Sequence, residues 1–236
     1  MTVTATCSPF DDEPPTRERY VLDHGFSFNP TTWRRRLPAP IDLPTFLSGL
    51  PLNGPWPRIS RGDLLRAGAE AHTGRAARDI LIAAYVWGHG LPSRRGPARL
   101  QRVLDLNGGD TDRWLGEAVS ILRSEGPRAA YEALDHGGRC KLKRLGPSFF
   151  TKLLYFLGWN SCSGRQRPLI LDRYVVIGLK RCGSVDWPEF GPWTADQYAE
   201  YLAWAREKAS QWGVETEADV VERRLWEYGK CLAAYR

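Results

Sequence analysis

The stretch that decides the fold is residues 139–158, which read RCKLKRLGPSFFTKLLYFLG. Residues 140–145 can form a short helix, residues 146–148 a tight turn and residues 149–157 a strongly apolar helix, with Pro147 preset for that helix's first turn. The free backbone amides at the start of such a helix can hold a phosphate, helped by the helix dipole. The stretch therefore predicts a helix-hairpin-helix unit that grips a sugar-phosphate backbone without reading its sequence.

Lys152 is the charged residue within the apolar helix. Helical spacing puts Ser148, Tyr155 and Trp159 beside it, so that a narrow semi-polar strip crosses the helix. Burial, the nearby helix N-terminus and the surrounding cations all disfavour the ammonium form, and this is how a lysine becomes an amine nucleophile. The alternative is a lysine whose amine reaches solvent or contacts a phosphate.

Asp172 follows Lys152 by 20 residues and comes directly after the apolar run 169–171. It precedes the helical pattern of residues 173–181, which makes it a good N-cap. A carboxylate at that position accepts backbone amide hydrogen bonds, stays ionised and points at whatever lies beyond the start of the helix. A purely structural cap is the alternative interpretation.

The positive charge of the chain is concentrated around this unit. Between Asp135 and Asp172 there is no acidic residue, and seven basic residues give this window a charge of +7. The net charge of the whole chain is +6, so the surplus lies in this window. Uncompensated cations repel one another unless a polyanion or solvent screens them, and nucleic acid is the obvious polyanion. A solvated basic loop is the alternative. The window holds seven basic residues: Arg139, Lys141, Lys143, Arg144, Lys152, Arg165 and Arg167.

Outward from this unit, the sequence divides into two parts. Ten of the 17 prolines precede residue 58, so residues 1–58 are expected to form an irregular, proline-rich arm packed over the remainder. Residues 59–236 show helical periodicity with few strand signals, which predicts a mainly α fold, and Ser60 is a plausible first N-cap. The expected helices cover residues 60–70, 73–88, 96–106, 110–124, 127–136, 147–158, 171–182, 194–212 and 215–233.

The overall composition excludes several classes of protein. With 236 residues, 42% hydrophobic and 25% charged, the chain is neither disordered nor a coiled coil. Its longest apolar stretch is far shorter than the ~20 residues that span a bilayer, and we expect a cytoplasmic protein with no membrane partner. The five cysteines and four histidines lack metal-ligand spacing, so no metal, iron–sulfur cluster or other cofactor is expected.

The sequence resembles the helix-hairpin-helix DNA glycosylases, and within them the 8-oxoguanine DNA glycosylase branch. The resemblance rests on residues 145–152 (LGPSFFTK) and 169–177 (LILDRYVVI), and it extends more weakly over residues 60–232, including 84–90 (AYVWGHG). The family hairpin usually has two glycines, whereas this chain has Gly146 alone. The resemblance implies a two-lobed helical fold and a monomer that binds double-stranded DNA with one base flipped out.

The resemblance also implies roles for individual residues. Lys152 would attack the anomeric carbon of the sugar, and Asp172 would stabilise the developing oxocarbenium charge. Trp87, His89 and Tyr155 would border the pocket of the flipped base, although Trp87 can equally be a core residue. The expected DNA contacts are Arg139, Lys141, Lys143, Arg144, Gly146, Ser148, Thr151, Arg94, Arg95, Arg165 and Arg167, and a solvated loop is the alternative for Arg94 and Arg95.

The function that the resemblance implies is base excision, with 8-oxoguanine as the expected base and strand cleavage through a lysine Schiff base. Another oxidised base, or a modified base of invading phage DNA, is an open alternative for the substrate. Two further alternatives are a helix-hairpin-helix protein that binds DNA without chemistry and an RNA-binding module that uses the basic window.

Overall fold

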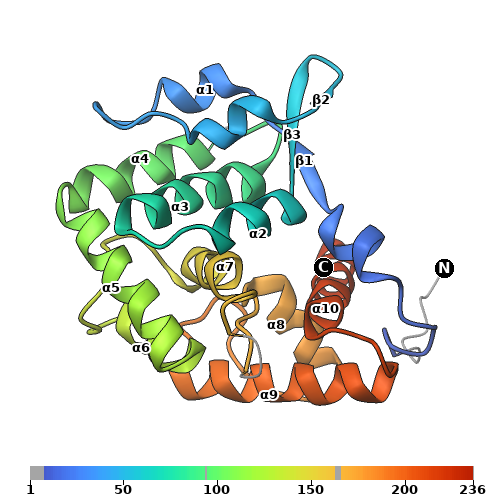
Figure 1. Ribbon diagram of the computed structural model, residues 1–236. Coiled ribbons are helices and arrows are strands. Elements are labelled where there is room, and N and C mark those ends of the chain that lie inside the picture. Colours follow the sequence, from blue (N-terminus) through green and yellow to red (C-terminus); the bar gives the residue numbers. More distant parts are fainter. Residues whose placement is uncertain (1–7, 94, 163–165, 236) are drawn as a thin grey trace.

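The computed structural model describes residues 8–93, 95–162 and 166–235 (Figure 1). It is mainly helical, as predicted, and the nine expected helices all form within three residues of their predicted bounds. Side chains cap several of these helices, and Ser60 and Asp63 form a capping box at the start of α2. The helices are α1 Pro30–Arg34, α2 Arg61–Ala69, α3 Gly74–His89, α4 Gly96–Asn107, α5 Asp110–Ser124, α6 Pro127–Leu134, α7 Pro147–Gly158, α8 Arg173–Arg181, α9 Ala195–Trp212 and α10 Ala218–Ala234.

The N-terminal arm is more ordered than the proline content predicts. A small antiparallel sheet forms in the order β1-β3-β2, and Phe26 pairs with Ile59 across its first two strands. Strand β3 continues through the expected boundary at residue 58 and leads directly into α2. Prolines restrict long helices, so the arm forms short helices, turns and short strands instead. Its elements are the π-helical turn Glu18–Leu22, β1 Gly25–Ser27, the 3-10 helix Thr45–Gly49, β2 Leu52–Asn53 and β3 Trp56–Ser60.

The short helix expected over residues 140–145 does not form, and the chain makes turns there instead. Six residues are too few to offset helix nucleation unless tertiary contacts support them. Here those contacts favour a loop, because the Asn107 side chain accepts a hydrogen bond from the Lys143 amide at 2.9 Å and donates to the Lys143 carbonyl at 3.1 Å. Arg144 has a φ of 68°, which also breaks a helix. The hairpin therefore joins α6 to α7 through turns, without the predicted short helix between them.

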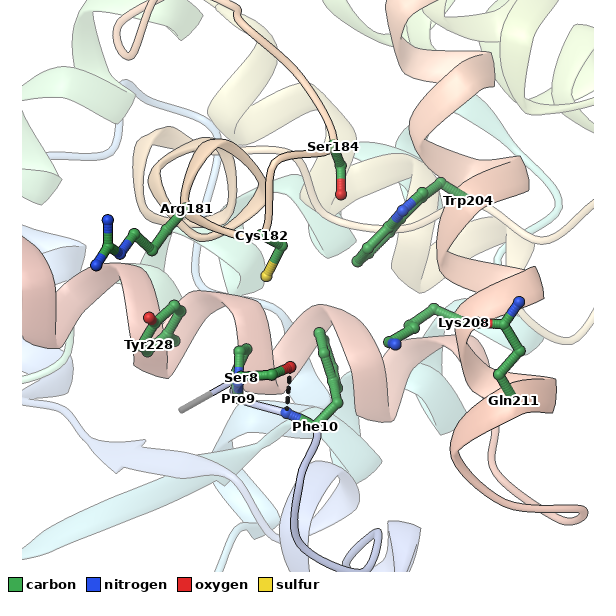
Figure 2. A pocket seen from close by; sticks show the side chains of 10 residues that line it. All are labelled: Ser8, Pro9, Phe10, Arg181, Cys182, Ser184, Trp204, Lys208, Gln211 and Tyr228. Atoms are coloured by element: carbon green, nitrogen blue, oxygen red, sulfur yellow. Dashed lines mark hydrogen bonds between the residues drawn. The ribbon is translucent and has the colours of Figure 1, made fainter. Parts of the chain in front are cut away.

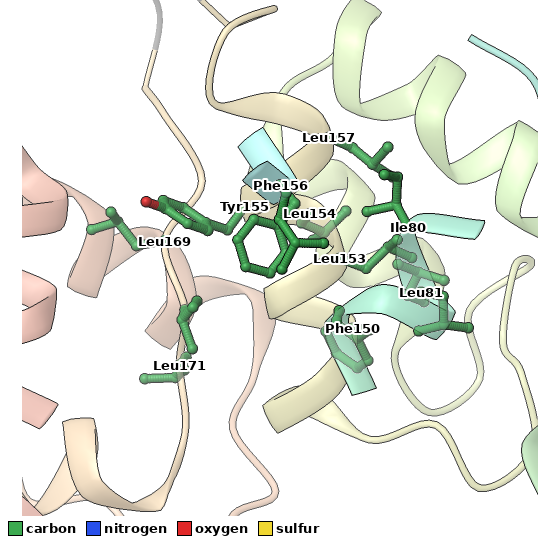
Figure 3. Packing of buried hydrophobic residues seen from close by; sticks show 14 of the residues in the cluster. Ile80, Leu81, Phe150, Leu153, Leu154, Tyr155, Phe156, Leu157, Leu169 and Leu171 are labelled. Atoms are coloured by element: carbon green, nitrogen blue, oxygen red, sulfur yellow. The ribbon is translucent and has the colours of Figure 1, made fainter. Parts of the chain in front are cut away.

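Helix α7 lies at the centre of the molecule, between the group α2–α6 and the group α8–α10 (Figure 1). Its apolar side chains explain this position, since Phe150, Leu153 and Leu154 are all buried. Figure 3 shows these side chains packed between those of α3 and the residues that precede α8. Lys152 is thus carried by the most buried helix of the protein, which fixes its position.

Helices α8 and α10 cross at short range. A Cβ atom on Gly229 would overlap the Tyr174 carbonyl oxygen, and one on Gly178 would approach the Leu225 carbonyl. Glycine at both positions lets the two backbones touch, and this brings α10 beside the start of α8. None of the helices in the described part of the chain is long and apolar enough to cross a membrane.

Candidate active site

The two expected catalytic residues meet at the centre of the fold. The ammonium Nζ of Lys152 donates to Asp172 Oδ2 at 3.2 Å and to the Ser148 carbonyl oxygen at 2.7 Å. Their side chains are only 9% and 13% exposed. Two charges withdrawn this far from water require mutual compensation, and the ion pair provides it.

Asp172 is the N-cap of α8, as the sequence predicts. Its Oδ1 accepts hydrogen bonds from the amides of Tyr174 and Val175 at 3.1 and 3.3 Å. The two carboxylate oxygens therefore have different partners, since Oδ1 is held by the helix start and Oδ2 faces the amine of Lys152. This division orients the carboxylate while leaving one oxygen to face a positive charge.

Three buried hydroxyl groups fasten the residues just before Asp172, and we call them the hydroxyl clamp: Thr151, Tyr198 and Tyr201. The Thr151 hydroxyl accepts the amide hydrogen of Leu171 at 3.0 Å, and the Tyr201 hydroxyl donates to the Ile170 carbonyl at 3.1 Å. The Tyr198 hydroxyl donates to the carbonyl of Leu169 at 2.9 Å. Because residues 169–171 lack regular secondary structure, these bonds satisfy backbone groups that have no helix or sheet partner. The clamp holds Asp172 in register with α7.

One face of α7 arranges the surroundings of the amine. Phe149, Lys152 and Phe156 are three and four residues apart, so they lie on the same side of the helix. Phe149 stacks on Tyr85 of α3 with ring centroids 3.9 Å apart, and its own centroid lies 5.3 Å from Lys152 Nζ. Gly88 of α3 faces the same place, where a Cβ would be in van der Waals contact with Phe149 and with the methylenes of Lys152.

Trp87 belongs to a connected group of five rings that we call the aromatic cluster, composed of His24, Phe26, Trp87, Tyr174 and Trp226. His24 is its centre, because its ring centroid lies 4.9 Å from Phe26, 5.3 Å from Trp87 and 5.7 Å from Trp226. Tyr174 packs on Trp226 from the first turn of α8. The cluster therefore adjoins Asp172 through Tyr174, and it adjoins Lys152 through Phe156, which packs edge-on against Trp87.

His24, at the centre of the cluster, is held in its neutral form by its surroundings. Burial lowers the pKa of His24 to about 2, and the nearby cations of Arg61 and Arg223 add to the effect. The imidazole is therefore neutral at physiological pH, and its buried Nδ1 has no described hydrogen-bond partner. Arg223 likewise leaves its buried Nε and Nη1 atoms unpaired among the described residues.

His24, Tyr174 and Trp226 are neighbours of the site that are not expected from the sequence. They come from the arm, the first turn of α8 and the last helix, and no motif connects such distant positions. The position of Tyr174, two residues after Asp172, was the one local signal that could have identified it.

The three residues expected at the base pocket occupy different environments. Trp87 is 4% exposed and lies in the aromatic cluster, where its Nε1 donates to the His24 carbonyl at 3.0 Å. His89 is partly exposed and stacks on Phe149 at 5.1 Å, and burial lowers its pKa. Tyr155 is completely buried and donates its hydroxyl hydrogen to Asp219 at 2.8 Å. Tyr155 therefore supports the site from within and presents no surface to a ligand.

The basic window is less uncompensated than its sequence suggests. Arg139 pairs with Glu117 of α5 at 3.0 Å, and Arg167 pairs with Glu217 at 2.8 Å. Sequence distance hides these pairs, because the carboxylates lie outside the window. Thr151 is fully buried in the hydroxyl clamp and has no surface for a DNA contact.

The remaining expected DNA contacts lie at or near the surface of the hairpin and the start of α4. Lys143, Arg144, Gly146 and Arg95 are exposed, while Lys141 and Ser148 are partly exposed. The Lys141 ammonium donates to the Leu145 carbonyl at 3.1 Å. Gly146 has a φ of −103° with open space around it, so its backbone does not require glycine. Arg94 and Arg165 lie outside the described residues.

A cavity of about 470 Å³ lies away from this site, between residues 8–10 of the arm and helices α8, α9 and α10 (Figure 2). Cys182 and Trp204 point into it. Burial raises the pKa of the Cys182 thiol to about 11, which makes the thiolate scarce at neutral pH. Neither Lys152 nor Asp172 lines this cavity. Within the described ranges, no group of three His, Cys, Asp or Glu side chains is arranged to hold a metal ion.

Comparison with known proteins agrees with this geometry. Residues 19–226 match the family described as "Putative 8-oxoguanine DNA glycosylase OGG-like protein". No curated protein and no solved structure matches the chain. The match spans the β-sheet, the hairpin, both members of the central ion pair and about half of α10. The chain therefore belongs to the OGG-like 8-oxoguanine DNA glycosylase family.

Proposed function

We propose that the protein removes 8-oxoguanine from double-stranded DNA and then cleaves the strand at the resulting abasic site. The observation that carries this proposal is the contact between the Lys152 amine and the Asp172 carboxylate, 3.2 Å apart. An amine that can become a nucleophile and a carboxylate oriented by a helix start are the two groups that this chemistry needs.

In the first step, the flipped nucleotide brings its C1′ atom to the pair. The bond between C1′ and the base breaks, and its electron pair leaves with the base. Positive charge then develops on C1′ and the ring oxygen. The Asp172 carboxylate, held by two backbone amides and still beside the Lys152 ammonium, also faces that charge.

In the second step, the amine must have lost a proton. The Lys152 ammonium donates to Asp172 Oδ2, and through this carboxylate the proton passes to the base, which left with the electron pair of its bond to C1′. The nitrogen lone pair then forms a bond to C1′, the sugar ring opens and a protonated imine results. Loss of a proton from C2′ breaks the C3′–O bond and cleaves the strand, and water finally releases the lysine.

The flipped base needs a surface that repays the cost of leaving the stack, which is a few kcal/mol. The aromatic cluster is the surface we propose, because His24, Trp226 and Tyr174 are each partly exposed. Their rings adjoin both members of the ion pair through Tyr174 and Phe156. Stacking on such rings contributes ~1–3 kcal/mol for each base.

Borohydride trapping tests the proposal directly. Reduction of the imine would join protein to DNA permanently, so a duplex with one 8-oxoguanine should give a covalent complex with the wild-type protein and none with Lys152→Ala. Lys180→Ala is the matched control, because Lys180 is a surface lysine paired with Asp186 at 3.1 Å. If no complex forms and Lys152→Ala still releases the base, the lysine acts only through its charge. Duplexes with other oxidised or modified bases identify the preferred substrate.

A second function is favoured by the capping role of Asp172. The carboxylate holds two amides of α8 regardless of any reaction, as expected for a DNA-binding protein without chemistry. Asp172→Asn separates the two functions, because asparagine is an equally good N-cap but carries no charge. A glycosylase loses base release by about 10²–10³-fold with DNA affinity retained, whereas a pure binder has no product to lose.

A further inference from the structure

A cavity of about 480 Å³ opens beside the hairpin, and we call it the arginine recess. The side chains that define it are four arginines and two aromatic rings: Arg95, Arg99, Arg102, Arg144, Tyr85 and Phe149. The basic window of the sequence contains only one of these arginines. The others are Arg95, which immediately precedes helix α4, and Arg99 and Arg102 within that helix, all outside the basic window.

Local geometry explains why the arginines converge. Arg95 is the N-cap residue of α4 and has helical backbone angles, and Arg99 and Arg102 follow at intervals of four and three residues, so the three lie on one face of that helix. Arg144 joins them from the hairpin. The Asn107 side chain at the end of α4 holds both the amide and the carbonyl of Lys143, which fixes the position of the neighbouring Arg144.

The recess carries charge that the described part of the protein does not neutralise. All four arginines are exposed, and none forms an ion pair with a carboxylate of the described residues. No acidic side chain lines the cavity. In contrast, Arg139 and Arg167 have acidic partners. Four guanidinium groups gathered in one hollow repel one another, and planar guanidinium forks match phosphate oxygens.

The position of the recess relative to Lys152 indicates which phosphates of a DNA strand could reach the arginines. Phe149 lines the recess, Lys152 is three residues further along the same face of α7, and Phe156 packs against the aromatic cluster four residues beyond that. The Lys152 amine reaches back to the Ser148 carbonyl and lies 5.3 Å from the centroid of the Phe149 ring, so it is next to the recess, with the aromatic cluster further along α7 at Phe156. In a nucleotide, the base and the phosphates extend from different sides of the sugar.

We propose that the arginine recess binds backbone phosphates of the DNA strand that carries the reacting nucleotide, next to its sugar. The assignment rests on the proposed function, because it takes the sugar to be at Lys152 and the base to be at the aromatic cluster. It adds Arg99 and Arg102 to the DNA interface and gives the recess a role in holding the strand while the base leaves the stack.

Salt-dependent binding tests the assignment. Each phosphate contact contributes about one to the slope of log affinity against log salt concentration. Arg99→Ala and Arg102→Ala should each lower the slope by about one and weaken binding to an undamaged duplex by about three- to tenfold at low salt. Arg206→Ala is the matched control, because Arg206 is an exposed arginine on α9, which lies away from α4 (Figure 1). An unchanged slope in both recess variants overturns the proposal.

Neutral phosphates locate the contact. A series of duplexes, each with one methylphosphonate near a stable abasic analogue, should reveal a position at which wild-type affinity falls and Arg99→Ala loses nothing further. If no position shows this coupling, or if the effect of Arg99→Ala depends on which base lies opposite the analogue, the recess does not bind backbone phosphate. The binding assays need no base release, so they can fail while excision is observed and succeed while it is not.

Discussion

Thr151→Val is the sharpest test of how the fold positions Asp172. The substitution keeps the branched shape of the side chain but removes the hydroxyl that accepts the amide hydrogen of Leu171 at 3.0 Å. Both residues are fully buried, so water cannot replace the lost acceptor. Leu171 immediately precedes Asp172, and its release loosens the end of the segment that carries the carboxylate.

We expect Thr151→Val to lower both the free energy of unfolding and the rate of base release. An unpaired buried amide costs about 1–3 kcal/mol of unfolding free energy. A displacement of ~1 Å at a reacting group can cost 10²-fold in rate, so we expect base release to slow by at least about tenfold. Affinity for DNA should stay unchanged, because Thr151 has no exposed surface.

Urea denaturation measures the first effect and single-turnover base release at saturating protein measures the second. Thr151→Ser is the matched control, since it keeps the hydroxyl and loses one methyl group, which costs about 1 kcal/mol. The serine variant should release the base at nearly the wild-type rate. If the valine variant is destabilised but reacts as fast as wild type, or if the serine variant is equally slow, the clamp does not position the carboxylate.

Three further predictions concern the residues around the site. The pKa of His24 is lowered to about 2 in the folded state, so the unfolded chain binds an extra proton below its ordinary pKa of 6.5. Stability is therefore lost as pH falls, and urea melts at pH 7 and pH 5 should differ by about 2 kcal/mol more for wild type than for His24→Gln. Arg61→Met should cost about 3–5 kcal/mol, because it leaves the buried Glu222 without its partner, whereas adding Glu222→Leu should restore most of the loss in the same urea assay. Gly229→Ala should lower the thermal midpoint markedly, since its Cβ would overlap the Tyr174 carbonyl oxygen, while Gly109→Ala, which has open space around it, should not.

The helices could be predicted from sequence because their signals are local. Caps such as Ser60 and Thr194, breaks such as Gly126-Pro127 and regular apolar spacing all act within a few residues. The hairpin was the exception, because its conformation depends on Asn107, which lies more than thirty residues earlier. Pairing in the arm was also hidden, since β1 and β3 are separated by a long irregular segment.

The candidate site divides in the same way. Lys152 and Asp172 could be identified because one lies in an apolar helix and the other caps the next helix, both of which are readable locally. The hydroxyl clamp and the aromatic cluster could not be identified, because a buried tyrosine or tryptophan has the same sequence signature as any core residue. The net charge of the basic window overstates its free positive charge for a related reason, since Glu117 and Glu217 neutralise arginines that are distant in sequence.

The arm and α10 both contribute rings to the aromatic cluster, so the cluster depends on the packing of the arm against this last helix. His24 from the arm meets Trp226 from α10, and in the interior Arg61, just after the arm, pairs with Glu222 of the same helix. Arg17 of the arm likewise pairs with the buried Asp219, which also accepts the Tyr155 hydroxyl hydrogen from α7. These contacts connect α7, which carries the amine, to both ends of the chain. The aromatic surface proposed for the base can therefore exist only once the arm has docked on α10, so the arm is part of the site that its sequence alone did not indicate.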